Sequence, residues 1–103
     1  MSALIEKVKK NLILEHSEDD GLIESYIASA TAYAESYQKK AVGFYTENTM
    51  DPTTEQAVIM LASHFYESRD GSTGGFYQDK VDASRQVWEV VNLLLRINRD
   101  VVI

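Results

Sequence analysis

The sequence predicts an all-α protein, a small single-domain bundle of about four helices with a flexible loop before the last helix. Three observations support this prediction. The chain has 103 residues, a length typical of one domain, so we expect residues 1–103 to fold together. It contains one proline and five glycines, three of them between Gly71 and Gly75, so most of the chain lacks helix breakers. Apolar residues recur at spacings of three and four in four separate stretches.

The first expected helix is short and amphipathic and spans residues 3–14. Lysines separate its apolar residues, which are Leu4, Ile5, Val8, Leu12 and Ile13. Their spacing places them on one face of a helix, and this face is expected to pack against the other helices.

The second and longest helix is expected at residues 18–40. Its apolar face consists of Leu22, Ile23, Tyr26, Ile27, Ala30, Tyr33, Ala34 and Tyr37. Ser17 followed three residues later by Asp20 has the form of a capping box, and acids suit the positive end of a helix dipole. We therefore expect Asp19 and Asp20 to be exposed to solvent and to cap the start of this helix. Gly43 is expected to supply the left-handed residue that ends the helix.

Residues 42–46 are expected to be a loop, because no nearby segment offers a partner strand. The third helix is expected at residues 52–68. Asp51 provides a capping side chain for it, and Pro52 has the backbone angle that a first helical turn requires. The centre of this helix, residues 57–62, is apolar on all sides, which is typical of a helix surrounded by other helices.

A glycine-rich segment, residues 69–78, is expected to be mobile in the free chain, with Phe76 and Tyr77 as anchors when it orders against a neighbour. The last helix is expected at residues 79–98 and carries two apolar stripes where a monomer needs one. The first stripe consists of Val87, Trp88, Val91, Leu94 and Leu95. The second stripe consists of Val90, Leu93, Ile97 and Val101.

A chain of this size has little area with which to cover the second stripe, so we expect it to contact a neighbouring chain. The alternative is that the first helix folds across this stripe through Leu4, Ile5 and Val8. The predicted core is Leu22, Tyr26, Ala30, Val58, Leu61, Phe65, Trp88 and Val91.

The net charge is −6 and the pI is near 4.8, which argues against a protein that binds nucleic acid by neutralising phosphates. A candidate acidic face consists of Glu15, Glu18, Asp19, Asp20 and Glu24. The chain has no cysteine, and no apolar run approaches the ~20 residues of a membrane span. We therefore expect no thiolate chemistry and no membrane insertion.

No pattern of catalytic, metal-binding or cofactor-binding residues is visible in the sequence. The two histidines, His16 and His64, lie in different segments and lack the spacing of a zinc site. The segment from Gly71 to Gly75 lacks the lysine of a phosphate-binding loop. We expect His64 to be half-buried and bonded to a carbonyl or to an acid such as Glu67. The sequence therefore predicts that the protein is not an enzyme and needs no cofactor.

Two stretches together resemble the small head-tail connector (DNA-packaging adaptor) family of tailed bacteriophages and prophages. The first runs from Asp20 to Tyr37 and the second, preceded by Pro52, from Gln56 to Arg69. The family also has a hydrophobic end to its first helix, matched by Asn11-Leu-Ile-Leu14, and a His-x-Tyr-Glu-x-Arg helix end, matched by His64 to Arg69. The resemblance covers residues 3–70 well and the last helix more loosely.

This resemblance implies a structural virion protein. It implies a ring of identical subunits beneath the portal after DNA packaging, which extends the DNA channel and docks the next head-completion or tail protein. The expected location is the head-tail junction of the virion, with assembly in the host bacterial cytoplasm. DNA is expected to pass without specific binding, since carboxylates do not hold phosphates. The alternative, from a different class, is a cytoplasmic interaction or regulatory subunit, antitoxin-like, that binds one partner through its last helix.

Overall fold

Five helices and no strand are present in the residues that the structure describes, which are residues 2–68 and 77–97 of this computed structural model. The helices are α1 (Ser2–Leu12), α2 (Asp20–Tyr37), α3 (Phe44–Glu47), α4 (Pro52–Glu67) and α5 (Tyr77–Arg96). The prediction of a small all-α protein is confirmed. The four long helices are the expected ones, each slightly shorter than or offset from its predicted range.

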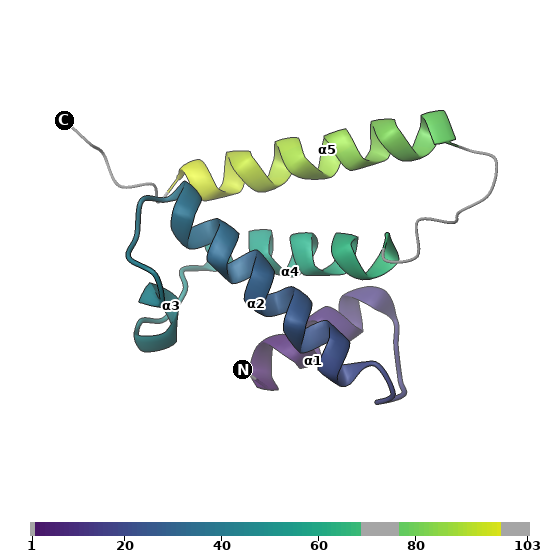
Figure 1. The fold of residues 1–103 in the computed structure, drawn as a ribbon, viewed down its shortest axis with the longest axis horizontal. Helices are drawn as coiled ribbons and strands as arrows, with labels where there is room; N and C mark the ends of the chain where they lie inside the picture. Colours follow the sequence, from purple (N-terminus) through teal and green to yellow (C-terminus); the bar gives the residue numbers. More distant parts are fainter. Residues whose placement is uncertain (1, 69–76, 98–103) are drawn as a thin grey trace.

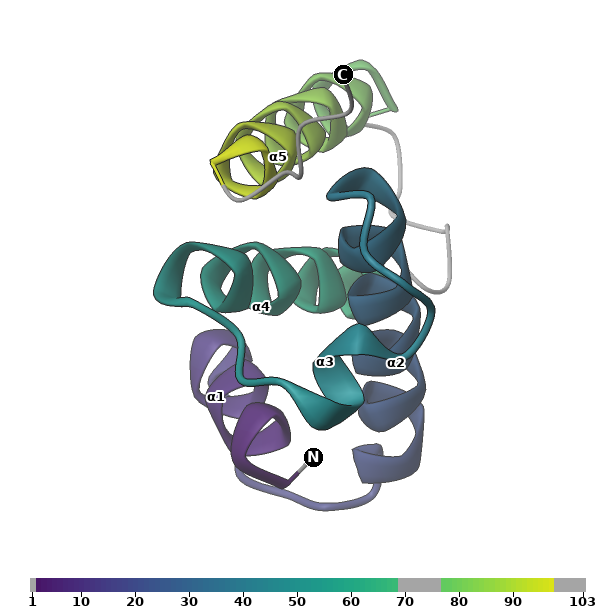
Figure 2. The ribbon, with the colours of Figure 1, turned by 90° about the vertical axis from the view of Figure 1, so that its left-hand side faces the viewer.

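The central helix is α4. Figures 1 and 2 show α4 between α5 on one side and α1 on the other, with α2 crossing it. Its buried apolar residues are Ala57, Val58, Ile59, Leu61, Ala62 and Tyr66. Because neighbouring helices surround α4, it needs no polar face along this stretch, as residues 57–62 predicted.

The core lies where α1, α2 and α5 meet α4. Its fully buried larger side chains include Ile23 and Ile27 of α2, Leu61 of α4 and Leu95 of α5. Four predicted core residues are buried, namely Ala30, Val58, Leu61 and Val91. Three predicted aromatic residues, Tyr26, Phe65 and Trp88, are only partly buried and pack against the edge of this core.

The prediction that Leu22 lies in the core is wrong, because 38% of this residue is exposed. The inward face of α2 is one residue further along and consists of Ile23, Ile27, Ala30 and Ala34. Two of these four are alanines, whose small side chains let the α2 backbone approach α4 closely. Tyr26, Tyr33 and Tyr37 widened the apolar face that the sequence predicted for α2. The strip that α4 actually covers is narrower.

The end of α2 differs from the expectation for Gly43. Lys39 takes the left-handed conformation, with φ of 65°, and the backbone N–H of Lys40 donates to the carbonyl oxygen of Glu35 over 2.8 Å. This is the bond pattern of a helix end closed by a left-handed residue. Gly43 is also left-handed, with φ of 83°, but it precedes α3 instead of ending α2.

The predicted loop at residues 42–46 contains the single turn of α3. The side chain of Glu35, which is buried on α2, holds this turn in place. One of its carboxylate oxygens accepts from the backbone N–H of Gly43 over 3.1 Å and the other from that of Tyr45 over 2.9 Å. A carboxylate that accepts N–H groups at the start of a helix stabilises the helix. A residue of the preceding helix therefore decides this local structure.

Helix α1 packs against α4 and α2, and the described residues show no contact between α1 and α5. Ile5 and Val8 are buried in that packing. Lys7 pairs with Glu55 over 2.8 Å, and the Asn11 side chain donates to the Ser63 hydroxyl over 2.8 Å. The alternative in which α1 covers the second stripe of α5 is therefore wrong.

Candidate interaction surfaces

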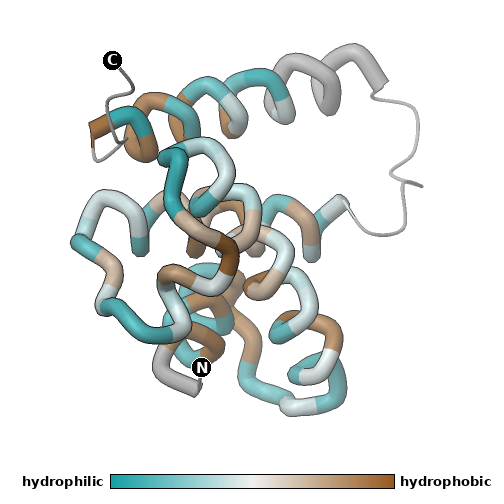
Figure 3. Tube along the Cα trace, turned by 60° about the vertical axis from the view of Figure 1, so that its left-hand side comes forward, coloured by the Kyte–Doolittle hydropathy of each residue, from teal (hydrophilic) through white to brown (hydrophobic). Residues whose placement is uncertain are grey.

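The outer face of α5 carries a row of exposed apolar side chains. Val90 is 42% exposed, Leu93 is 58% exposed, and Ile97, directly after the helix, is 64% exposed. Figure 3 shows the hydrophobic end of α5 in brown at the edge of the molecule. We call Val90, Leu93 and Ile97 the outer row. It contains all the residues of the second predicted stripe that the structure describes.

Some predicted interface residues lie outside the described residues. These are Phe76 and Val101, together with most of the predicted mobile segment at residues 69–78. Tyr77 begins α5, but its side chain is outside the described part as well.

The inner face of α5 attaches the helix to the rest of the fold. Val91 and Leu95 are buried against α4 and α2. Two hydrogen bonds reinforce this packing: the Tyr33 hydroxyl donates to the side-chain oxygen of Asn92 over 2.6 Å, and the Gln38 amide donates to the Leu95 carbonyl over 3.1 Å. One face of α5 is therefore held firmly while the opposite face carries the outer row.

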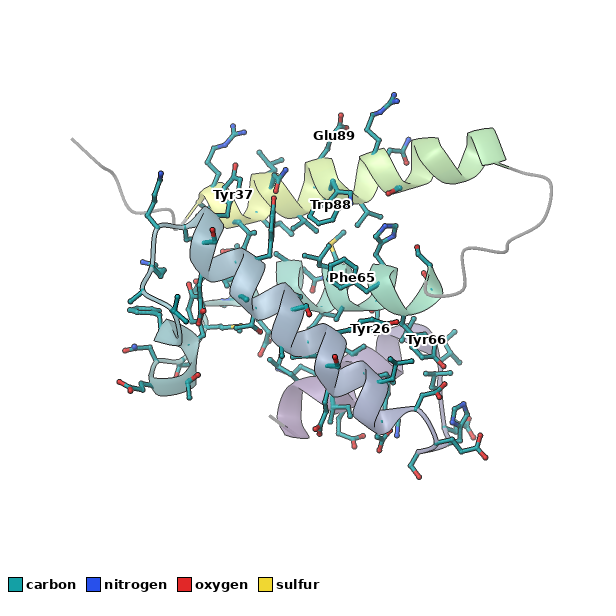
Figure 4. All side chains as sticks on the ribbon, viewed as in Figure 1. Tyr26, Tyr37, Phe65, Tyr66, Trp88 and Glu89 are labelled. Atoms are coloured by element: carbon teal, nitrogen blue, oxygen red, sulfur yellow. The ribbon has the colours of Figure 1, made fainter. Side chains whose placement is uncertain are left out.

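Aromatic side chains fill the seam between α2, α4 and α5. The ring of Trp88 meets that of Tyr33 edge to face at 5.1 Å between centroids and that of Phe65 at 6.2 Å. Figure 4 shows Trp88 pointing from α5 toward the other helices, while Glu89 beside it points away. An open hollow of about 440 Å³ lies next to this seam and is lined by Tyr26, Ser29, His64, Phe65, Ser68 and Trp88.

His64 lies at the rim of this hollow and is half-buried, as expected. Its Nε2 atom lies 3.2 Å from the hydroxyl oxygen of Ser84 on α5. The contact joins α4 to α5.

A buried polar network joins α2, α3, α4 and α5. Its centre is Gln38, which is fully buried. The side-chain nitrogen of Gln38 donates to the Thr54 hydroxyl over 2.9 Å and to the Leu95 carbonyl, and its side-chain oxygen accepts from the Tyr45 hydroxyl. The Thr54 hydroxyl in turn donates to Asp51 over 2.7 Å. Each of these contacts satisfies a polar group that burial would otherwise leave without water.

Two side chains of this region have shifted pKa values. Burial raises the pKa of the Tyr33 hydroxyl, with Tyr37 adding to the effect, and the hydrogen bond to Asn92 opposes it only in part. For Asp51, burial alone raises the pKa, but hydrogen bonds from Thr53 and from the hydroxyl and backbone N–H of Thr54 outweigh burial and lower the pKa below its ordinary value. Asp51 is also the N-cap of α4, as the sequence predicted.

Sequence reasoning missed Glu35 and Gln38. Both stand near the end of an amphipathic helix, where polar residues indicate contact with solvent. Their partners include Tyr45, Thr54 and Leu95, which are separate in the sequence. No local pattern marks such residues as buried, because only the crossing of the helices brings donors and acceptors together.

The candidate acidic face divides into two groups. Glu15 and Glu18 are exposed between α1 and α2, and Glu24 is exposed on α2. Asp19 accepts a hydrogen bond from the Tyr66 hydroxyl, and Asp20 pairs with the Lys9 ammonium group over 2.9 Å. These two aspartates are partly buried, and together they join the start of α2 to α4 and α1.

The expectation that Asp19 and Asp20 cap α2 from solvent is therefore wrong. Asp19 is the N-cap residue, but its side chain makes no capping bond, and Ser17 accepts from Asp20 only through its backbone carbonyl. A buried tyrosine hydroxyl and a nearly buried lysine are stronger partners for these carboxylates than exposed backbone N–H groups.

Two further observations concern only the described residues. Among them, no three side chains of the kind that bind metal ions gather in one place. None of their helices is both long and apolar enough to cross a membrane.

Comparison with known proteins identifies a family for this chain. The family model described as phage gp6-like head-tail connector protein matches residues 2–99. No curated protein and no solved structure matches the chain significantly. The resemblance carried by the second and third helices in the sequence is thereby confirmed and extends through α5.

Proposed function

Because this chain belongs to the phage gp6-like head-tail connector family, we propose that it forms a ring of identical subunits between the portal and the next protein of the head-tail junction. A connector of this family is a structural protein of the phage particle. We propose three things beyond this structural role: the ring itself, its contact with the portal, and the docking of a head-completion or tail protein.

The observation that supports this proposal best is the outer row of α5. Val90, Leu93 and Ile97 form one continuous line on a helix whose opposite face is already buried. A large exposed apolar line on a small protein marks a contact surface. In a ring, each subunit offers this line to a different surface of the next subunit or of the portal, and the contacts repeat until the ring closes.

The exposed acids suit a surface along which DNA moves. Glu15 and Glu18 between α1 and α2, and Glu24 on α2, are exposed. Carboxylates repel the DNA phosphates, so DNA passes them without being held. Asp19 and Asp20 lie between these acids in the sequence. Their side chains bond to Tyr66 and Lys9, so they stabilise the fold at this face.

The proposal requires no catalytic step, no metal and no cofactor. Assembly takes place in the host bacterial cytoplasm, and the protein then remains in the virion. The surplus apolar surface and the negative charge both fit a protein that works by contact with other proteins.

Reconstitution with the portal protein of the same phage tests the proposal. The test variant is Leu93→Asp combined with Ile97→Asp, which puts two charges into the outer row. The matched control is Ile13→Asp combined with Val42→Asp, since these two apolar residues are 84% and 100% exposed elsewhere on the molecule. Electron microscopy of portal complexes shows whether a ring forms, and circular dichroism shows whether each variant is folded.

We expect the wild type and the control to form rings on the portal and the outer-row variant to remain folded without forming them. A folded outer-row variant that assembles as well as the wild type would remove α5 from the interface. A wild-type protein that stops at a one-to-one complex with a soluble partner and ignores the portal would favour the regulatory alternative.

A further inference from the structure

The outer row of α5 has the register of a coiled-coil seam. Val90, Leu93 and Ile97 are separated by three and four residues, and the exposed Gln86 precedes Val90 by four. Alternating spacings of three and four keep side chains on one line along a helix, and such a line pairs with a second helix. Here the line faces away from the protein, because Val91 and Leu95 hold the opposite face of α5 in the core.

Two opposite charges flank the row on the same side. Glu89 precedes Val90, Arg96 precedes Ile97, and both side chains are exposed. Seven residues separate them, which is close to two helical turns and about 10 Å along the axis. Within the described part of the chain, neither residue has an ion-pair partner. From Ser84 to Ile97, where the structure describes the side chains, the other flank of the row carries Val87 and Leu94 and no charge.

This arrangement selects one way of pairing two copies of α5. In a parallel pair, the charged flank of each helix meets the uncharged flank of its partner, so Glu89 and Arg96 find no opposite charge. In an antiparallel pair related by a two-fold axis, charged flank meets charged flank. Val90 of each copy then lies beside Leu93 of the other copy. Glu89 of each copy lies opposite Arg96 of the other, so the pair contains two identical contacts between opposite charges.

We propose that the free protein pairs with a second copy of itself through an antiparallel contact between the two α5 helices. The contact is centred between Val90 and Leu93 and is closed on one flank by two identical ion pairs between Glu89 and Arg96. The pairing stands independently of the proposed ring. Only its consequence rests on the proposed function: a two-fold pair covers the outer row, so subunits must separate before the same row joins a ring.

The test exchanges the two charges and measures association of the purified full-length chain by sedimentation velocity at low salt. Glu89→Arg and Arg96→Glu, made singly, place like charges opposite each other and are expected to weaken the dimer about tenfold or more, which is about 1.4 kcal/mol. The double variant Glu89→Arg with Arg96→Glu restores both ion pairs. An equimolar mixture of the two single variants restores them as well, between unlike copies. Glu24→Arg, an exposed charge reversal on α2, is the control.

Recovery in both the double variant and the mixture supports the antiparallel pair, as does weaker association at higher salt. The proposal is overturned if the wild type is monomeric up to about 1 mM. It is also overturned if the single reversals have no more effect than Glu24→Arg, or if the double variant is as weak as the single ones. Ring formation on the portal is measured separately. A wild type that forms rings but no free dimer overturns only this inference, and a wild type that forms the dimer but no ring overturns only the proposed function.

Discussion

The hydroxyl group of Tyr33 on α2 donates a 2.6 Å hydrogen bond to the side-chain oxygen of Asn92 on α5. These two residues are 59 positions apart in the sequence, and their contact lies next to the ring contact between Tyr33 and Trp88. The bond fixes the rotation of α5 about its own axis. It therefore helps to decide which residues of that helix face the core and which form the outer row.

Replacing Tyr33 with Phe is expected to lower the free energy of unfolding by about 1 kcal/mol, because a part-buried hydrogen bond is lost and the Asn92 oxygen loses its donor. Urea unfolding of Tyr33→Phe, Asn92→Ala and the double variant measures the coupling between the two side chains. Strictly additive effects would show that the bond adds nothing to stability.

Replacing Gln38 with Ala is expected to cost about 3 kcal/mol. The change leaves the Tyr45 hydroxyl, the Thr54 hydroxyl and the Leu95 carbonyl short of partners in a buried place. Gln56→Ala, at an exposed position of α4, is the matched control and is expected to stay within about 0.5 kcal/mol of the wild type. Equal losses in the two variants, measured by urea unfolding, would contradict the network.

Asp51 gives stability a defined dependence on pH. Its pKa is lower in the folded chain than in the unfolded chain. Its contribution to stability is therefore present above the pKa of the unfolded chain and is lost as the pH falls through the pKa of the folded chain. Asp51→Asn keeps an N-cap but removes the charge. The stability difference between wild type and variant is expected to be largest at neutral pH and to shrink in acid. A constant difference from pH 7 to pH 2 would refute this assignment.

Ile13 occupies a left-handed conformation, with φ of 59°, directly after α1. The backbone N–H of Leu14 donates to the Lys9 carbonyl over 2.9 Å and closes the helix end around it. A β-branched residue is strained there and glycine is not, so Ile13→Gly is expected to raise the unfolding free energy by about 0.5–1 kcal/mol.

The control for this prediction is Lys10→Gly, which places glycine inside α1 at an exposed position. It is expected to lower stability by about 1 kcal/mol, since glycine is a poor helix former. Thermal unfolding of both variants measures the two effects. A loss of stability in Ile13→Gly would show that the exposed isoleucine side chain contributes more than its backbone strain costs.

Local patterns in the sequence determined the helical class, the four long helices and the central place of residues 57–62. Each of these depends on the spacing of apolar residues or on a start signal such as Asp51-Pro52, and both act within a few residues of the chain. The two apolar stripes of the last helix could also be predicted from the sequence, because the 3.6-residue period of an α-helix decides on which face each side chain lies. The structure confirms Ala30, Val58, Leu61 and Val91 in the core for the same reason.

Only the tertiary structure decided which strip of each helix is covered and which polar groups are buried. Leu22 is exposed because α4 meets α2 one residue further along, and Asp19 bonds to Tyr66 because α4 brings that hydroxyl to it. Glu35 builds the turn of α3 in the same way. These contacts join residues that are between 8 and 47 positions apart. Their energies depend on burial, which exists only once the helices have crossed.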